Sequence, residues 1–359
     1  MTRCDCTKDD LRSDEDITIP LDLPDDWRCP RKTIEGSNRC IFHSQSGSTT
    51  GEAATKAVIE SLSATPTDHP FAAELDERKL NVARKRFIGA RFNTLILTDE
   101  LIEQTDTLPV DFRSVNINTL DISGARIECD LHLFGASIES LNASKTTVVG
   151  SIKAEKLSIE KECTFEDSNI TGDVKIHDGT LSSFTIINAK IGGRLELNNT
   201  TIQGDVFGTE CIIDGRFEFK EGDVHGGIYC PGLSLRGEKR FSNTSELTFR
   251  GTSVESGVTL EHLRSEGEIM LNELKVGGDL CLDFAEINDS LWLGAVADES
   301  TTLGSVDVSG NLTAKNAYVG AEFDFAESEG GIEKGPQVGA SIDFSGIHVE
   351  GDMLSSRLC

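Results

Sequence analysis

The sequence predicts an all-β chain dominated by a right-handed, four-sided parallel β-helix, with a small Cys/His module and a short helical cap before it. Three observations support this class: apolar residues that recur about every five positions, turn residues that cluster between them, and an unusual composition. The 359 residues are only 37% hydrophobic and 6% aromatic, which favours a thin repetitive core over one thick globule. Glycine is abundant at 34 and proline scarce at 8, as expected for a chain that turns often.

The repeat itself begins near Asp111. Its apolar positions step by five or six residues, which fits neither a helix nor one long strand. A second apolar residue stands two positions before several of them, so each short face has side chains pointing in, out and in. Four such faces, about 21 residues, predict one coil, and about twelve coils for the whole repeat region. The stepping positions include Ile122, Ile127, Leu133, Ile138, Ala143 and Val148, and the corners include Gly192-Gly193, Gly204-Asp205 and Gly277-Gly278-Asp279.

Four segments follow from composition. Residues 1–46 form a cysteine-rich module that we interpret as zinc-binding, and residues 47–66 form a Ser/Gly/Thr-rich linker that includes a short helix near 52–62. Residues 67–105 form a helical cap that leads into the β-helix, because apolar residues in 71–87 recur at three to five positions. Residues 106–359 form the β-helix.

Within the β-helix the register weakens at 236–256 and 294–305, where we expect longer loops. Near the end of the sequence, Ile342 and Phe344 are expected to point inward in a coil with no capping element after it. An uncovered coil invites association, so we expect a homodimer through the C-terminal coil.

The repeat resembles that of the pentapeptide-repeat family, whose unit is Ala-(Asp/Asn)-Leu-x-x. Gly-Ala-Ser-Ile at 135–138 and Phe-Ala-Glu-Ile at 284–287 match its Ala-x-apolar step, although many units here alternate five and six residues. The front of the chain is similar to haloarchaeal pentapeptide-repeat proteins, and the likeness covers nearly all of the chain. It implies a cytoplasmic protein of a salt-loving archaeon, without catalytic residues to carry over. The front residues that carry it are Trp27-Arg28-Cys29-Pro30, Cys40-Ile41-Phe42-His43, Phe87-Ile88-Gly89-Ala90-Arg91-Phe92 and Pro109-Val110-Asp111-Phe112-Arg113.

The best candidate site is the pattern Cys29-x10-Cys40-x2-His43. Zinc prefers four thiolate or imidazole ligands in a tetrahedron, and a two-residue gap lets Cys40 and His43 reach one ion. Cys4 would complete a Cys3His set, with Cys6 as the alternative to Cys4. Four protein ligands leave no open position, so the predicted zinc is structural. Cysteines without metal in a flexible tail, or a disulfide, remain alternatives.

The net charge of the chain favours some classes of binding partner and disfavours others. With 61 acidic and 34 basic residues the net charge is −27, which fits either a surface adapted to a high-salt cytosol or a mimic of DNA phosphates. Direct nucleic-acid binding is not expected, because phosphates require a basic surface. One basic run could contact a nucleic acid or an acidic partner, or simply form a solvated helix face. It consists of Arg78, Lys79, Arg84, Lys85, Arg86 and Arg91.

Nothing in the sequence indicates an enzyme. It lacks the glycine-rich, nucleophile-elbow and His-Glu-x-x-His motifs, and its carboxylates are too numerous to select an acid/base pair. No stretch of about 18 apolar residues predicts a membrane span, and no apolar leader is present. We therefore expect a cytoplasmic, non-enzymatic scaffold that binds a protein. The alternative is a DNA mimic that regulates a topoisomerase or another DNA-binding protein, and a carbohydrate-active hydrolase is less favoured.

Overall fold

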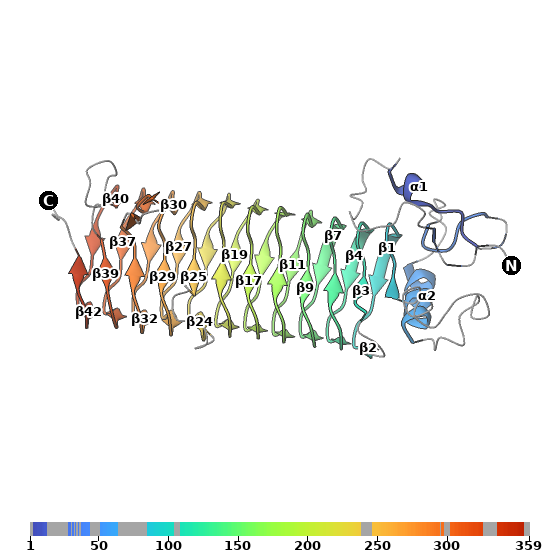
Figure 1. The fold of residues 1–359 in the computed structure, drawn as a ribbon, viewed down its shortest axis with the longest axis horizontal. Helices are drawn as coiled ribbons and strands as arrows, with labels where there is room; N and C mark the ends of the chain where they lie inside the picture. The colour runs from blue at the N-terminus through green and yellow to red at the C-terminus, as the bar shows by residue number, and fades with distance from the viewer. Residues whose placement is uncertain are drawn as a thin grey trace. The chain divides into compact units, whose positions relative to one another are not determined.

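The computed structural model describes residues 3–12, 28–29, 31, 33, 35, 37–43, 51–63, 85–103, 108–237, 246–294, 296–297, 302–325 and 336–354. The chain forms two compact units: residues 1–165 with 169–179, and residues 166–168 with 180–359. Each unit is built from the coils of a parallel β-helix (Figure 1). The described helices are α1 (Lys8–Arg12) and α2 (Gly51–Ser63), and neither is long and apolar enough to cross a bilayer.

In the first unit, three six-residue strands each run along two adjacent faces, and the other described strands are two residues long. They pair in parallel, with Asn116 beside Ser137 and Ser137 beside Ser158, so one coil takes 21 residues here. The strands are β1 (Arg91–Ile96), β2 (Leu101–Ile102), β3 (Val110–Asp111), β4 (Asn116–Asp121), β5 (Arg126–Ile127), β6 (Leu131–His132), β7 (Ser137–Asn142), β8 (Thr147–Val148), β9 (Ile152–Lys153), β10 (Ser158–Ile159), β11 (Cys163–Thr164), β12 (Asn169–Ile170) and β13 (Val174–Lys175).

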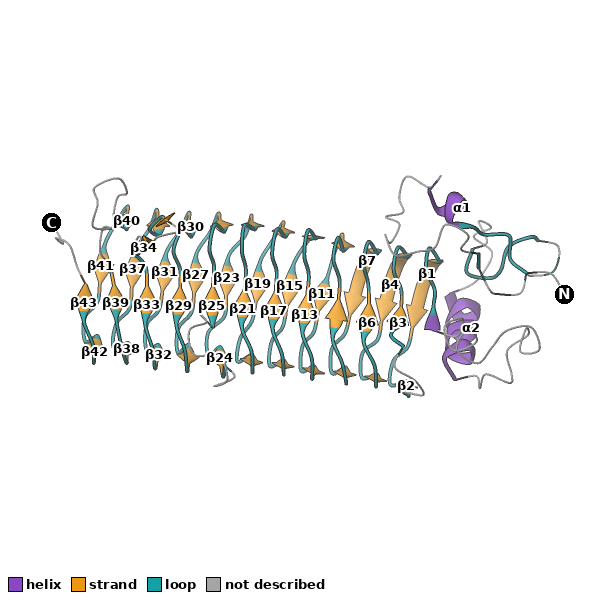
Figure 2. Cartoon of the chain, viewed as in Figure 1, coloured by secondary structure: helices purple, strands orange, loops and turns teal. Residues whose placement is uncertain are grey.

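In the second unit every described strand has two residues, and a regular coil has four strands and 22 residues (Figure 2). Lys190 lies beside Ile212, and Ile212 beside Ser234. The strands are β14 (Thr180–Leu181), β15 (Phe184–Thr185), β16 (Lys190–Ile191), β17 (Leu195–Glu196), β18 (Thr201–Ile202), β19 (Val206–Phe207), β20 (Ile212–Ile213), β21 (Phe217–Glu218), β22 (Asp223–Val224), β23 (Ile228–Tyr229), β24 (Ser234–Leu235), β25 (Leu247–Thr248), β26 (Ser253–Val254), β27 (Val258–Thr259), β28 (Arg264–Ser265), β29 (Ile269–Met270), β30 (Lys275–Val276), β31 (Leu280–Cys281), β32 (Glu286–Ile287), β33 (Leu291–Trp292), β34 (Val296–Ala297), β35 (Thr302–Leu303), β36 (Asp307–Val308), β37 (Leu312–Thr313), β38 (Tyr318–Val319), β39 (Phe323–Asp324), β40 (Gln337–Val338), β41 (Ile342–Asp343), β42 (His348–Val349) and β43 (Met353–Leu354).

Two corners of a regular coil contain one residue in the left-handed region. Asn188 follows β15 and Asn199 follows β17, both with φ of 53°. Asparagine, aspartate and glycine reach this region at low cost, which explains why they recur in the repeat. The other two corners are tighter bends, in which glycine is common, as in Gly192-Gly193 after β16.

The inward positions predicted from spacing are confirmed. Ile122, Ile127, Leu133, Ile138, Ala143 and Val148 are all at most 1% exposed. No disulfide bond joins any of the nine cysteines in the described residues. Of the cysteines in the repeats, Cys129, Cys163, Cys211 and Cys230 are buried as small apolar side chains, whereas Cys281 is outward and half-buried.

The expected longer loops are present where the register weakens. Phe217 and Leu247 are partners 30 residues apart, and Lys275 and Asp307 are partners 32 residues apart, with the antiparallel pair β34–β35 inside that second interval. A third interval of 30 residues, from Asp307 to Gln337, was not expected. One face carries 11 strands over the two units taken together, against about twelve coils expected.

Two expected features near the ends differ from the structure. The helix expected over 71–87 lies mostly outside the described residues. Its expected C-terminal end is wrong, because Arg86 forms a parallel β-bridge with Asp111 and Phe87 is not helical. In the last described coil, Phe344 packs edge-on against Phe323, with ring centroids 5.1 Å apart, as an inward residue should. Ile342 nevertheless remains 36% exposed. Homodimerisation through this coil stays a prediction.

The helix expected near 52–62 is confirmed as α2, and it covers the edge strand β1. Its buried residues Ala54, Val58 and Leu62 are spaced by four and form one face. The Ile96 N–H at the edge of β1 donates to Thr55 Oγ1 (3.1 Å). Gly51 lies so near Thr94 that an added Cβ would be 3.0 Å from the threonine Cβ.

The core can be tested with two phenylalanines of the second unit. Phe217 is fully buried, with its ring 5.3 Å from that of Phe249, whereas Phe207 of the same coil is 37% exposed. We expect Phe217→Ala to lower the free energy of unfolding by about 3–5 kcal/mol, because it leaves a cavity. The control Phe207→Ala should cost about 1 kcal/mol or less. Denaturant titration measures both, and equal losses would contradict the inward and outward assignment.

Candidate metal centre

The N-terminal ligands are positioned by a short antiparallel pairing. Thr7 and Arg28 form a β-bridge, and the Cys29 N–H donates to the carbonyl of Cys6 (2.9 Å). The Cys4 N–H donates to the carbonyl of Arg31 (2.8 Å). These bonds fix the register that sets Cys4 beside Cys29.

Helix α1 begins directly after this pairing and stabilises it. The Thr7 N–H donates to the Asp10 carboxylate (2.7 Å), and the Asp10 N–H donates to Thr7 Oγ1 (3.3 Å). This reciprocal arrangement is a capping box, which satisfies donors that a helix N-terminus leaves over. Asp10 also pairs with Arg39 (2.8 Å), and this hydrogen bond holds the pKa of Asp10 at about 2. The pair connects α1 to the segment that carries Cys40.

The other two ligands lie in one tight turn. The His43 N–H donates to the carbonyl of Cys40 (3.1 Å), which folds residues 40–43 back on themselves. The Cys40 N–H donates to Cys4 Sγ (3.2 Å), so the turn is held against the first ligand. Backbone N–H donors to thiolate sulfur stabilise its negative charge.

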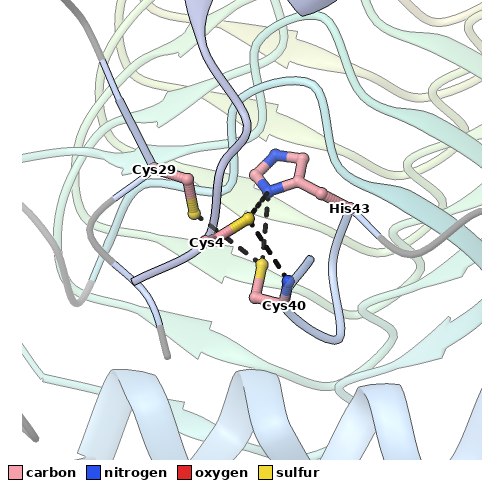
Figure 3. A group of neighbouring side chains, drawn as sticks. All are labelled: Cys4, Cys29, Cys40 and His43. Carbon is pink, nitrogen blue, oxygen red and sulfur yellow. Dashed lines mark hydrogen bonds between the residues drawn. The ribbon is translucent and has the colours of Figure 1, made fainter. Parts of the chain in front are cut away.

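Cys4, Cys29, Cys40 and His43 converge, with one ligand atom from each lying within 4.8 Å of the other three (Figure 3). The Cys29 and Cys40 sulfurs are 3.7 Å apart, and His43 Nδ1 lies 3.7 Å from Cys4 Sγ and 3.2 Å from Cys40 Sγ. With Zn–S bonds of about 2.3 Å, the edge of a tetrahedron is about 3.8 Å. The separations therefore fit four ligands around one tetrahedral ion.

The second ring nitrogen of His43 sets the tautomer. His43 Nε2 is 3.0 Å from the carbonyl oxygen of Ile88, which can only accept a hydrogen bond. The proton therefore resides on Nε2 in the neutral ring, and the lone pair of Nδ1 faces the three sulfurs. This outer hydrogen bond is typical of metal-bound histidine.

Hydrogen bonds within the group shift its pKa values in opposite directions: they raise the pKa of Cys29 well above the ordinary thiol value and lower that of Cys4. Hydrogen bonds from Cys29 and then Cys40 hold the pKa of Cys4 far below the ordinary thiol value, so this thiol ionises readily. Burial lowers the pKa of His43, but hydrogen bonds with Cys4 and Cys40 raise it well above its usual range. A metal ion would displace the shared protons, so affinity should fall as pH falls.

The converging group contains Cys4 and not Cys6. Cys6 is also buried, but its thiol points toward the carbonyl of Thr7 (4.0 Å) and is outside the four-residue group. Sequence spacing left these two open. The register of the Thr7–Arg28 bridge decides between them, and no spacing rule reveals that register.

The centre is joined to the first coil of the β-helix. The Arg91 N–H on β1 donates to the carbonyl of Phe42 (3.0 Å), between two ligands in sequence. The Phe42 ring packs edge-on against Phe87 (5.3 Å between centroids). Arg31 lies over both rings and donates to Ser61 Oγ on α2 (2.8 Å) and to the carbonyl of Arg86 (3.0 Å). The Cys/His module is therefore part of the cap of this coil.

Comparison of the chain with protein-family models, curated proteins and solved structures gives no match.

Exchanging each candidate cysteine tests the ligand set. Cys4→Ser should lose bound metal, with affinity lowered by more than about 100-fold, because the loss of a ligand exceeds the loss of an outer partner. The matched control Cys6→Ser should retain one ion per chain. Elemental analysis of protein purified under reducing conditions gives both values. A metal-free wild type, or equal retention in the two variants, would show that this group is not a metal site.

Proposed function

We propose that this protein is a cytoplasmic, non-enzymatic scaffold of the haloarchaeal pentapeptide-repeat type, whose Cys3His centre holds a structural zinc ion. All four zinc positions would be filled by protein, so the ion would stabilise the fold instead of reacting. The centre would cover the edge of β1, because among the described residues no strand pairs with β1 on the side away from β4. A protein partner would dock on the outer faces.

The observation that carries the docking proposal is an exposed aromatic residue in a strained backbone position. Phe284 is 48% exposed and has a φ of 60°. The corresponding corners of the neighbouring described coils hold Gly232, Asn316 and Gly346, which suit this conformation, and His262. A bulky residue in the left-handed region costs about 1–2 kcal/mol. Backbone strain at an exposed aromatic residue favours a functional role.

The surroundings of Phe284 support a protein-binding surface. Its ring stacks on His262 at 5.1 Å between centroids. On the same succession of strands, β19, β23, β27 and β31, Phe207 stacks on Tyr229 at 5.6 Å. Exposed aromatic side chains are enriched where proteins bind one another. This aromatic face, defined by Phe207, Tyr229, His262 and Phe284, is the surface we assign to a protein partner.

Phe284→Asn tests this assignment without disturbing the corner. Asparagine tolerates the left-handed backbone, so the free energy of unfolding should stay within about 1 kcal/mol of wild type. A photo-crosslinking amino acid placed at Tyr229 should capture one cellular protein, and Phe284→Asn should abolish that crosslink.

Leu101→Asn is the control for that experiment, because Leu101 is an exposed apolar residue (52%) of the first unit. It should leave the crosslink unchanged. No crosslinked protein, or the same yield with Phe284→Asn as with wild type, would argue against a docking face here.

DNA mimicry is the second candidate, and an acidic stripe of the second unit favours it. Strands β29, β33 and β39 pair in succession, and a carboxylate stands one or two residues before each of them. These residues, Glu268, Asp289 and Glu322, define the stripe. Burial, and then the charges of Asp289 and Glu322, raise the pKa of Glu268, so the carboxylates repel one another. Coils about 4.8 Å apart would present charge less densely than the ~3.4 Å rise of a DNA strand.

A charge-neutral variant of the stripe separates mimicry from salt adaptation. If the stripe imitates phosphates, wild type should inhibit a DNA topoisomerase, and Glu268→Gln/Glu322→Gln should weaken inhibition about 10-fold, since complementary charges guide such encounters. Glu100→Gln/Glu103→Gln removes the same charge from the first unit and should have no effect. A plasmid relaxation assay reads the result. Absence of inhibition, or the same loss with both variants, would leave the acidic surface as salt adaptation.

A further inference from the structure

Helix α2 depends on contacts outside itself. Its 13 residues form fewer than about four turns, a length at which an isolated helix is marginal in water. Its buried face consists of Ala54, Val58 and Leu62, which is a small apolar area. The last turn contains no basic side chain of its own to complement the negative end of the helix dipole. The position of α2 on β1 therefore depends on what the last turn contacts.

A cation from the Cys/His module reaches that last turn. Arg31 Nη1 donates to Ser61 Oγ in the last turn of α2 (2.8 Å), and Arg31 Nη2 donates to the carbonyl of Arg86 (3.0 Å). The guanidinium lies over the rings of Phe42 and Phe87, at 4.4 and 4.6 Å from their centroids. A planar guanidinium that is stacked on rings and hydrogen-bonded through two nitrogens is held in one orientation. It fixes the end of α2 relative to the residues that lead into β1.

The backbone of the same residue is tied to the metal-ligating residues. Arg31 follows Cys29 by two positions, and its carbonyl accepts the N–H of Cys4 (2.8 Å). Burial lowers the pKa of Arg31, whereas the charges of Cys29 and Cys40 raise it, so the guanidinium lies in the field of these thiols. Metal binding fixes ligands from separate segments together and is coupled to local folding. Occupancy of the centre would therefore set the position of Arg31.

Helix α2 in turn covers the edge of the β-helix (Figure 1). The Ile96 N–H of β1 donates to Thr55 Oγ1 (3.1 Å), so one edge amide has its acceptor on the helix. At Gly51 an added Cβ would lie 3.0 Å from the Cβ of Thr94, which shows how closely helix and strand approach. A strand edge that loses its cover presents unpaired backbone groups to other chains.

We propose that Arg31 is a positioning residue through which metal occupancy keeps α2 on β1, so that loss of the ion releases the helix and exposes this edge of the β-helix. The proposal rests on the proposed zinc centre and adds a conformational switch to it. None of the four ligands belongs to α2, so the ion has no direct hold on the helix. Arg31 contacts both the ligand segment and the helix.

Hydrogen exchange of backbone amides in the full-length protein, followed by NMR with zinc ions or with a chelator present, tests the proposal. In wild type the Ile96 amide should exchange at least about 10-fold more slowly with zinc than with chelator, because its acceptor Thr55 stays in place. Arg31→Met retains an apolar side chain against the rings but removes the donors to Ser61 and Arg86. In this variant zinc should change the exchange of Ile96 by less than about 2-fold.

Two controls show whether the effect belongs to this link. The Arg91 amide donates to the Phe42 carbonyl in the ligand turn (3.0 Å), so zinc should protect it in Arg31→Met as in wild type. Lys56→Met removes an exposed cation from the same helix and should leave the zinc effect on Ile96 unchanged. Arg31→Lys keeps a cationic donor and should restore part of that effect.

The amount of bound zinc, measured by elemental analysis of the same samples, separates this proposal from that of the metal centre. A wild type that binds zinc without slower exchange at Ile96 overturns the link alone, and a wild type that binds no zinc overturns both. Loss of zinc from Arg31→Met also overturns the link, because Arg31 would then be needed for the metal site itself. The same holds if zinc slows the exchange of Ile96 in Arg31→Met as it does in wild type, or if Lys56→Met abolishes the effect.

Discussion

The backbone N–H and C=O groups of a β-helix coil form hydrogen bonds with the coils on either side of it. The outer edge of the first coil therefore needs hydrogen-bond partners from outside the repeat. In this protein, segments that precede the repeat supply those hydrogen-bond partners. Thr55 of α2 accepts a hydrogen bond from the Ile96 N–H, and the Phe42 carbonyl accepts one from the Arg91 N–H. The Cys/His group rigidifies the turn that contains Phe42. The geometry of the Cys/His group and the stability of the first coil are therefore linked through the backbone carbonyl of Phe42.

The spacing of apolar residues predicted the coils because a two-residue strand with a fixed corner leaves few options for the inward side chain. Ile122 and Ile127 are buried as that pattern required. The spacing of apolar residues does not predict where a loop is inserted into a coil. The interval between Asp307 and Gln337 is as long as the loop-bearing interval between Phe217 and Leu247, but it was not foreseen. Length variation between coils is carried by surface loops, which the core pattern does not constrain.

The candidate metal group could be predicted in part, for a physical reason. Cys40 and His43 lie in one turn, so their spacing alone brings them together. Cys4 reaches them only through backbone pairing across residues 4–7 and 28–31, which leaves no periodic signal. The contact between Arg31 and Ser61 was beyond sequence reasoning altogether, since these residues meet only after the Cys/His module has folded against α2. The basic run was noticed, yet its interpretation as a solvated helix face is wrong at Lys85, which is buried.

The acidic residues divide into two kinds by what they contact. Asp130 accepts the Ser151 N–H of the following coil (2.9 Å) and pairs with Lys153 (2.9 Å). Burial alone would raise the pKa of Asp130, but these two contacts hold it below its ordinary value. Such carboxylates are part of the stacking and would be retained in any solvent. Glu268 has the opposite shift, because burial and neighbouring charges disfavour its ionised form. Neighbouring carboxylates that repel one another lower the stability of the fold, so a functional role would explain why they are present. Carboxylates that join successive coils stabilise the fold and need no such explanation.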